Sequence, residues 1–148
     1  MFESEHRAEI QDVDVKEVWR RLEQEPDAAI IDVRTQTEWA FAGLPDLKSL
    51  GKQLVAMEWQ GFPGARLNPS FVDQPRAEFA ATGVDKDATL FFVCRSGVRS
   101  LRAAQVMARE VYRGCHNVAG GIEGPHDESG HRGSVSGWKA AGLPWAQA

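Results

Sequence analysis

The chain has 148 residues, of which 43% are hydrophobic and 26% are charged, and its formal net charge is −4. This length suits one folded domain, since domains commonly contain roughly 100–200 residues. So mild a charge argues against a nucleic-acid partner or a membrane-surface protein. The acidic N-terminal residues do not resemble a signal peptide, and no apolar run approaches the roughly 18 residues that span a membrane. The two cysteines cannot form a disulfide framework. We therefore expect a soluble protein of the reducing cytoplasm.

Short apolar strands alternate with helices along the chain. Strands are expected at residues 10–13, 28–33, 53–59, 87–93 and 116–118. Helices are expected from the N-cap Asp14 to residue 22, over 37–41, over 71–81, and from Gly97 or Val98 to about Tyr112, with one helical turn at 138–141. This order predicts an α/β fold whose largely parallel central sheet, of about five strands, is flanked by helices on both faces.

We expect one domain over residues 1–148, with its core at about 10–145. Residues 121–137 are rich in Gly, Ser, His and charge, and they are expected to form a long loop. The long helix after Gly97 places Leu101, Ala104, Ala108 and Val111 at helical spacing, so we expect these side chains to form its apolar face.

Cys94 directly follows the strand expected at 87–93 and directly precedes the long helix. Ligand sites in open α/β sheets form beyond the carboxyl ends of the strands. A helix N-terminus carries unpaired N–H groups and about half a positive charge, and Arg95 and Arg99 add two full charges nearby. Gly97 would let the backbone curl into a nest of amides that binds anions. These features favour the thiolate, so we expect Cys94 to be a catalytic nucleophile rather than a structural core cysteine.

Residues 94–100, Cys-Arg-Ser-Gly-Val-Arg-Ser, resemble the active-site loop of rhodanese-type sulfurtransferases. Two further segments resemble that family: residues 30–34 with the acidic-aromatic pair at 38–39, and residues 117–121 followed by Trp138. The resemblance covers about residues 10–145 and implies a single rhodanese-like domain. The chain departs from the family where many members carry Gly-His-Ile, since residues 43–46 here are Gly-Leu-Pro-Asp. The rim of the pocket is therefore expected to differ.

The resemblance implies a sulfurtransferase of the thiosulfate:cyanide type that needs no cofactor. The Cys94 thiolate would attack the outer sulfur of a small anionic donor such as thiosulfate, release sulfite and keep a persulfide. Cyanide or a thiol, which could belong to a protein, would then accept the sulfur. The remaining loop residues would bind the substrate through their amides and guanidinium groups: Arg95, Ser96, Gly97, Val98, Arg99 and Ser100.

Asp32 and Arg34 are expected to support the site, because they end the strand beside the loop. Asp32 would hydrogen-bond groups of the loop, and Arg34 would pair with Glu38 and fix the turn that follows. Which arginine of the loop faces the pocket is left open by the sequence, as is the oligomeric state.

Two other functions share a reactive cysteine. A carrier would receive sulfur from one protein and deliver it to another, with weak activity on small molecules. A cysteine phosphatase or arsenate reductase would need five residues between cysteine and arginine, whereas four lie between Cys94 and Arg99. The shorter loop suits a single sulfur better than a tetrahedral phosphate.

Cys115 and the histidines are not expected to take part in chemistry. Cys115 follows the end of the long helix that Cys94 begins, so we expect it to be structural and distant from Cys94. His126 and His131 have two carboxylates between them, but Gly130 and Ser129 argue against a helix that would align four ligands. We therefore expect no metal site.

Overall fold

The computed structural model describes residues 10–59, 86–109, 112–133 and 135–147. Its main sheet contains five parallel strands in the order β1-β6-β5-β2-β4, which confirms the expected fold. These strands are β1 (Asp12–Val13), β2 (Ala29–Asp32), β4 (Val55–Ala56), β5 (Thr89–Val93) and β6 (Gly114–Val118). The helix expected at 71–81 lies outside the described residues.

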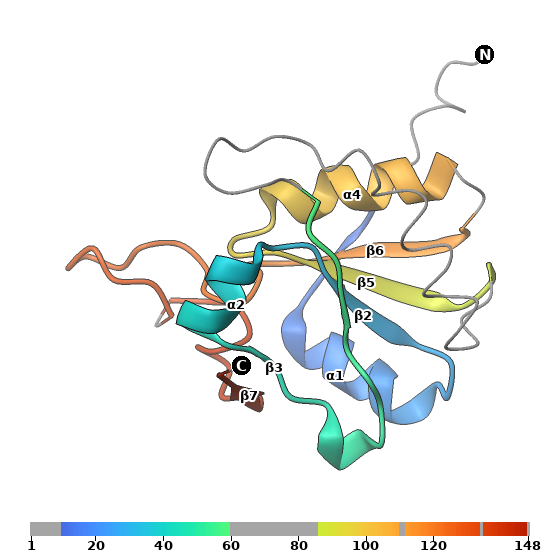
Figure 1. Cartoon of the computed structure of the whole chain (residues 1–148), viewed down its shortest axis with the longest axis horizontal. Coiled ribbons are helices and arrows are strands. Elements are labelled where there is room, and N and C mark those ends of the chain that lie inside the picture. The colour runs from blue at the N-terminus through green and yellow to red at the C-terminus, as the bar shows by residue number, and fades with distance from the viewer. Residues whose placement is uncertain (1–9, 60–85, 110–111, 134, 148) are drawn as a thin grey trace.

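Helices cover both faces of the sheet, as Figure 1 shows for α4 (Val98–Arg109) on one side and α1 (Val15–Gln24) on the other. Alternate side chains of a strand point to opposite faces. Accordingly, Leu90 and Phe92 of β5 pack in the cluster that includes Met107 of α4, and Phe91 packs in the cluster that includes Leu22 of α1. Both faces of β5 are buried, which explains its continuous apolar sequence.

The buried face of α4 differs from the face expected from its apolar spacing. Ala103, Ala104 and Met107 are buried together with Ser100, whereas Leu101 is only partly buried. Ala104 is buried as expected, but the expectation for Leu101 was wrong because Ser100, a polar residue, turns inward to make hydrogen bonds near the Cys94 sulfur. Val111 lies outside the described residues. Ala108 is likewise only partly buried.

The two N-terminal helices begin at side-chain caps. Asp14 caps α1 by accepting a 3.0 Å hydrogen bond from the Lys16 amide, as expected. The second helix, α2 (Gln36–Ala42), begins at Thr35, which forms a capping box with Glu38. It ends at Gly43, whose φ of 88° favours glycine.

A small antiparallel ribbon was not expected from the sequence. It pairs β3 (Leu44–Pro45), directly after α2, with β7 (Trp145–Ala146). A Cβ on Gly43 would lie only 2.6 Å from Cε3 of Trp145, so the glycine allows the two segments to approach. The end of the described chain is therefore packed against the segment that follows α2.

The remaining described segments are short or irregular. The 3-10 helix η2 (Lys48–Leu50) lies between β3 and β4. Residues 121–133 and 135–137 contain neither helix nor strand, as expected for a long loop, and Figure 1 shows this loop extending away from the sheet. Residues 138–142 form a hydrogen-bonded turn. None of the helices in the described residues has the length and apolarity that crossing a membrane requires.

Candidate active site

Cys94 lies where three neighbouring strands end at the same edge of the sheet. It follows Val93, the last residue of β5, which is in register with Asp32 at the end of β2. On the other side, Phe92 of β5 is in register with Asn117 of β6. Parallel strands present their carboxyl ends together, and this edge is where α/β proteins bind ligands.

Two backbone amides and one hydroxyl group lie close to the Cys94 sulfur. The Gly97 amide lies 3.1 Å from Sγ, the Ser100 amide 3.4 Å, and the Ser100 hydroxyl oxygen 3.3 Å. Gly97 has a φ of 113°, a conformation that turns its amide toward the sulfur at no cost from a Cβ. Cys94 is only 1% exposed, yet two backbone amides point at its sulfur. Amides directed at sulfur stabilise its anionic form.

The other loop residues differ in how they face the solvent. Arg95, Ser96 and Val98 are exposed, and Val98 is 65% exposed. Among the described residues, no amide of these three donates to the Cys94 sulfur. Arg95 makes no ion pair with any residue that the structure describes, so its guanidinium group is free to meet an anion.

Arg99 is held by Glu38 of α2. Two hydrogen bonds of 2.7 Å join their guanidinium and carboxylate groups. Burial disfavours the Glu38 carboxylate, but hydrogen bonding and charge from Arg99, with help from Thr35, lower its pKa to about 2. The pKa of Arg99 is raised chiefly by Glu38, with smaller effects from Cys94 and Asp32. Arg99 therefore lies within electrostatic reach of the sulfur, although its hydrogen bonds go to Glu38.

The expected pairing of Arg34 with Glu38 was wrong. Arg34 instead pairs with Asp32 in an ion pair of 2.7 Å, and both side chains are fully buried. Arg34 Nη2 also donates to the carbonyl of Gly43 at 2.6 Å. The capping box of α2 points Glu38 away from Arg34 and toward Arg99. The pair therefore ties the end of β2 to the end of α2, and Asp32 makes no hydrogen bond with a described residue of the 94–100 loop.

Residues 121–124 support the Cys94 loop from behind. The amide of Ile122 donates to the Cys94 carbonyl at 2.9 Å, and the amides of Glu123 and Gly124 donate to the Arg95 carbonyl at 3.0 and 3.1 Å. A Cβ on Gly121 would lie 2.4 Å from the Cys94 carbonyl oxygen, and the φ of this glycine is 65°. The backbone of the loop is thus held against a segment whose close approach requires glycine at position 121.

Asn117 and Asp12 belong to the site, although the sequence analysis missed their role. Asn117 Oδ1 lies 2.5 Å from the Ser100 hydroxyl oxygen, and its Nδ2 donates to Asp12 Oδ1 at 2.8 Å and to the Gly97 carbonyl at 3.1 Å. Asn117 is 3% exposed. A polar residue in a short buried strand is the signal that would have found it, because buried amides need partners.

Cys115 is placed away from the loop. It is in register with Leu90, four residues before Cys94, so the two lie roughly 13 Å apart along the strands. Burial raises the pKa of the Cys115 thiol to about 12. His126 and His131 are exposed on the long loop, and no three His, Cys, Asp or Glu side chains group around a possible metal in the described residues.

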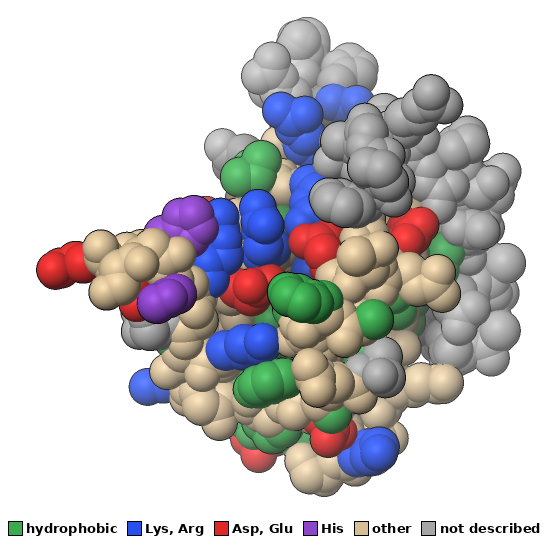
Figure 2. Space-filling model, turned by 60° about the vertical axis from the view of Figure 1, so that its left-hand side comes forward, with side chains coloured by type: hydrophobic (Ala, Val, Ile, Leu, Met, Phe, Trp, Pro, Cys, Tyr) green, Lys and Arg blue, Asp and Glu red, His purple; other side chains and the backbone are tan. Residues whose placement is uncertain are grey.

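Figure 2 shows the face of the molecule that carries the long loop and α2. Lys and Arg side chains gather in the middle of this face, beside the His side chains of the long loop and with acidic side chains between them. The mixture agrees with the exposure of Arg95 and with the pairing of Arg99 to an acidic residue.

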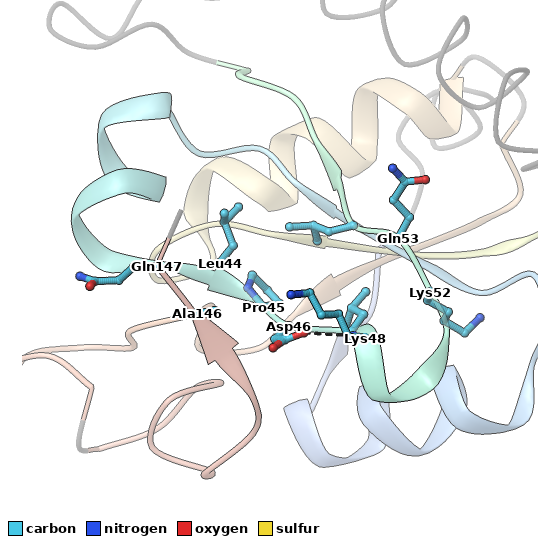
Figure 3. Close-up of a pocket in the computed structure, with 10 residues that line it drawn as sticks. Leu44, Pro45, Asp46, Lys48, Lys52, Gln53, Ala146 and Gln147 are labelled. Atoms are coloured by element: carbon cyan, nitrogen blue, oxygen red, sulfur yellow. Dashed lines mark hydrogen bonds between the residues drawn. The ribbon is translucent and has the colours of Figure 1, made fainter.

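A separate pocket of about 310 Å³ lies between β3, η2 and the end of the chain (Figure 3). Its lining includes Leu44, Leu54 and Ala146 but no residue of the 94–100 loop. Lys52 reaches the rim, where its ammonium donates to the carbonyls of Glu25, Pro26 and Ala28. These three bonds join the segment after η2 to the residues that follow α1, which makes Lys52 a structural residue of the pocket wall.

Comparison with known proteins identifies the family. A family model described as the STR4 middle domain matches residues 11–148. The chain belongs to this family of rhodanese-type domains. The crystal structure of Rv0390 from M. tuberculosis has the same fold and superposes on this chain with a TM-score of 0.85. The two sequences are 37% identical, and the match covers 95% of this chain and all of that one.

Two curated relatives show what the rhodanese domain resembles. The uncharacterized protein RC0915 of Rickettsia conorii is 33% identical over 137 residues, which cover 92% of this chain and 97% of that protein. A protein of Allochromatium vinosum named "Sulfurtransferase" is 25% identical over 113 residues, which cover 76% of this chain and 85% of that protein. The rhodanese domain is therefore similar to proteins of the sulfurtransferase family.

Proposed function

We propose that the protein is a sulfurtransferase that carries a sulfane sulfur as a persulfide on Cys94. The observation that supports this proposal best is the set of donors around the sulfur: the amides of Gly97 and Ser100 lie 3.1 and 3.4 Å from Sγ. They would stabilise the negative charge that the sulfur carries before attack and again as a leaving group. The similarity to a named sulfurtransferase agrees with this chemistry.

The reaction would proceed in two displacement steps. The Cys94 thiolate attacks the outer sulfur of thiosulfate, the S–S bond of the donor breaks, and sulfite leaves with the electron pair. An acceptor thiolate or cyanide then attacks the outer sulfur of the persulfide, and the Cys94 thiolate is released. No electrons enter or leave the protein, so no redox cofactor is needed.

The two arginines of the loop would have different roles. Arg95 is exposed and free of ion pairs with described residues, so it would attract the anionic donor. Arg99 is bound to Glu38 through two hydrogen bonds, so it would act at the sulfur as part of a neutralised pair. A phosphatase arginine must bind the substrate with its own guanidinium fork, and this pairing argues against that reaction.

The proposed setting is the cytoplasm, where small persulfides and protein thiols would be the donors and acceptors. Neither nucleic acid nor a membrane is part of the proposal. The burial of Cys94, at 1% exposure, favours a small or extended acceptor over a globular surface thiol.

The proposal is tested by intact-protein mass spectrometry after treatment with thiosulfate. We expect the protein to gain one sulfur atom, which cyanide removes as thiocyanate. Cys94→Ser should gain none, whereas Cys115→Ser, the matched control, should behave like the wild type. Sulfur on Cys115, or release of phosphate from an aryl phosphate without thiocyanate formation, would refute the assignment. A persulfide that forms without catalytic turnover would identify a carrier.

A further inference from the structure

Hydrogen bonds connect β1 with the Cys94 sulfur through three side chains. Asn117 Nδ2 donates to Asp12 Oδ1 at 2.8 Å and to the carbonyl of Gly97 at 3.1 Å. Asn117 Oδ1 lies 2.5 Å from Ser100 Oγ, and this hydroxyl oxygen lies 3.3 Å from Cys94 Sγ. Ser100 is fully buried and Asn117 is 3% exposed, so bulk water does not compete for these bonds.

The direction of each bond follows from the groups at the far end. A carboxylate and a carbonyl oxygen only accept hydrogen bonds, so the amide nitrogen of Asn117 must face Asp12 and Gly97. Its oxygen then faces Ser100 and accepts a hydrogen bond from the Ser100 hydroxyl. A hydroxyl has one proton, so in this arrangement Ser100 offers Cys94 only lone pairs. In this orientation, Ser100 Oγ accepts a hydrogen bond from the Cys94 thiol and its proton is not available to the sulfur.

We infer that Asn117, oriented by Asp12, is a positioning residue that holds the Ser100 proton away from the Cys94 sulfur and so favours the thiol in the resting protein. When Cys94 loses its proton, the Ser100 hydroxyl turns to donate to sulfur and leaves Asn117 Oδ1 unpaired. The amides of Gly97 and Ser100 favour the thiolate, and Asn117 opposes them. The inference rests on the proposed function only in taking Cys94 as the nucleophile.

Other charged groups surround Cys94 and must stay constant in a test. They are Arg99 of α4 with its partner Glu38 of α2, and Asp32 with Arg34 at the end of β2. None of the variants below alters these four side chains.

The test is the pH dependence of Cys94 alkylation by iodoacetamide, measured without any sulfur donor. Trypsin places Cys94 in the peptide of residues 87–95 and Cys115 in that of residues 114–132, so mass spectrometry follows each thiol separately. Asn117→Leu removes the acceptor at similar volume. It should move the midpoint of the Cys94 profile to lower pH by about one unit, since one hydrogen bond to an anion has an effect of this order. Asp12→Ala, at an exposed residue, frees the amide to turn and should give a smaller shift in the same direction.

A second background separates this effect from a change of loop structure. In Ser100→Ala the shared proton is absent, so adding Asn117→Leu should leave the midpoint unchanged. A shift of equal size in both backgrounds, or no downward shift in the Ser100 background, overturns the inference. Where Asn117→Leu does not fold, Asp12→Ala is compared with and without Ser100→Ala. The loss of the Asp12 charge acts in both backgrounds, so the inference requires a larger downward shift when Ser100 is present. Because no sulfur donor is present, a protein that fails to form a persulfide but shows the shift refutes only the proposed function.

Discussion

Substitution of Gly121 by alanine should disturb the Cys94 loop from its rear side. The new Cβ would lie 2.4 Å from the Cys94 carbonyl oxygen and 2.6 Å from the Arg95 carbonyl carbon and oxygen, all of them backbone atoms. The φ of 65° adds about 1–2 kcal/mol of left-handed strain for alanine. Forcing the backbone apart adds about 1–3 kcal/mol, the usual effect of overpacking. We expect a total destabilisation of about 2–5 kcal/mol and a slower formation of the Cys94 persulfide.

Gly130→Ala is the matched control for this substitution. Gly130 lies in the same long loop with a φ of 81°, but its Cβ would meet no atom within 4 Å. It should therefore show only the conformational strain and react with thiosulfate at the wild-type rate. Thermal unfolding and the rate of sulfur uptake, measured on both variants, give the comparison. A difference of about 2 kcal/mol corresponds to roughly 4–8 °C in Tm for a domain of this size. Equal Tm and equal rates in the two variants would show that the contact of Gly121 with the Cys94 backbone does not position the loop.

Two further predictions concern ionisable groups. The pKa of Glu38 is lowered to about 2, so the stability that its ion pair with Arg99 contributes is complete above about pH 4.5 and is lost as the pH falls toward 2. The free energy of unfolding of Glu38→Gln should therefore be lower by about 1 kcal/mol near pH 7, after allowance for solvent screening. Below pH 4.5, urea unfolding should show this free energy declining less steeply with falling pH than in the wild type. A decline as steep as that of the wild type contradicts the prediction. Burial raises the pKa of Cys115 to about 12, so its peptide should remain unalkylated at pH 8 until urea unfolds the protein. Alkylation of Cys115 in the native protein at the same rate as Cys94 would disprove this prediction.

Local sequence patterns were sufficient to predict the main elements of the fold. The apolar run of β5, the Asp14 cap of α1 and the start of α4 near Val98 follow from composition and spacing over a few residues. The position of Cys94 between β5 and α4 follows from the same patterns. A parallel sheet then places the loop at its carboxyl edge whatever the order of the strands.

Contacts between distant segments could not be predicted in this way. The β3–β7 ribbon joins two pairs of residues about 100 positions apart, and neither pair shows an alternating pattern. The predicted partner of Arg34 was wrong because Thr35 caps α2 and its capping box directs Glu38 toward Arg99, while Arg34 pairs with Asp32. That Thr35–Glu38 capping box is visible in the sequence and would have corrected the prediction.

The hydrogen bonds among Ser100, Asn117 and Asp12 are also contacts between distant segments, so local sequence patterns do not predict them. Asn117 meets Ser100 because β6 lies beside β5, and the neighbour of a strand is not encoded in its own residues. The inward direction of Ser100, which shifted the buried face of α4, is a consequence of that meeting.

The order of the strands also has a consequence for how the protein is made. The groups around Cys94 come from β1, α2, α4 and β6, so they are brought together by loop closures that are slow compared with helix formation. During synthesis, Asn117 leaves the ribosome 23 residues after Cys94, which takes about 1–5 s at elongation rates of about 5–20 residues per second. In that interval the nascent chain presents Cys94 and Ser100 without the side chain of Asn117. The hydrogen bond between Ser100 and Asn117 beneath the sulfur therefore forms only when β6 docks beside β5.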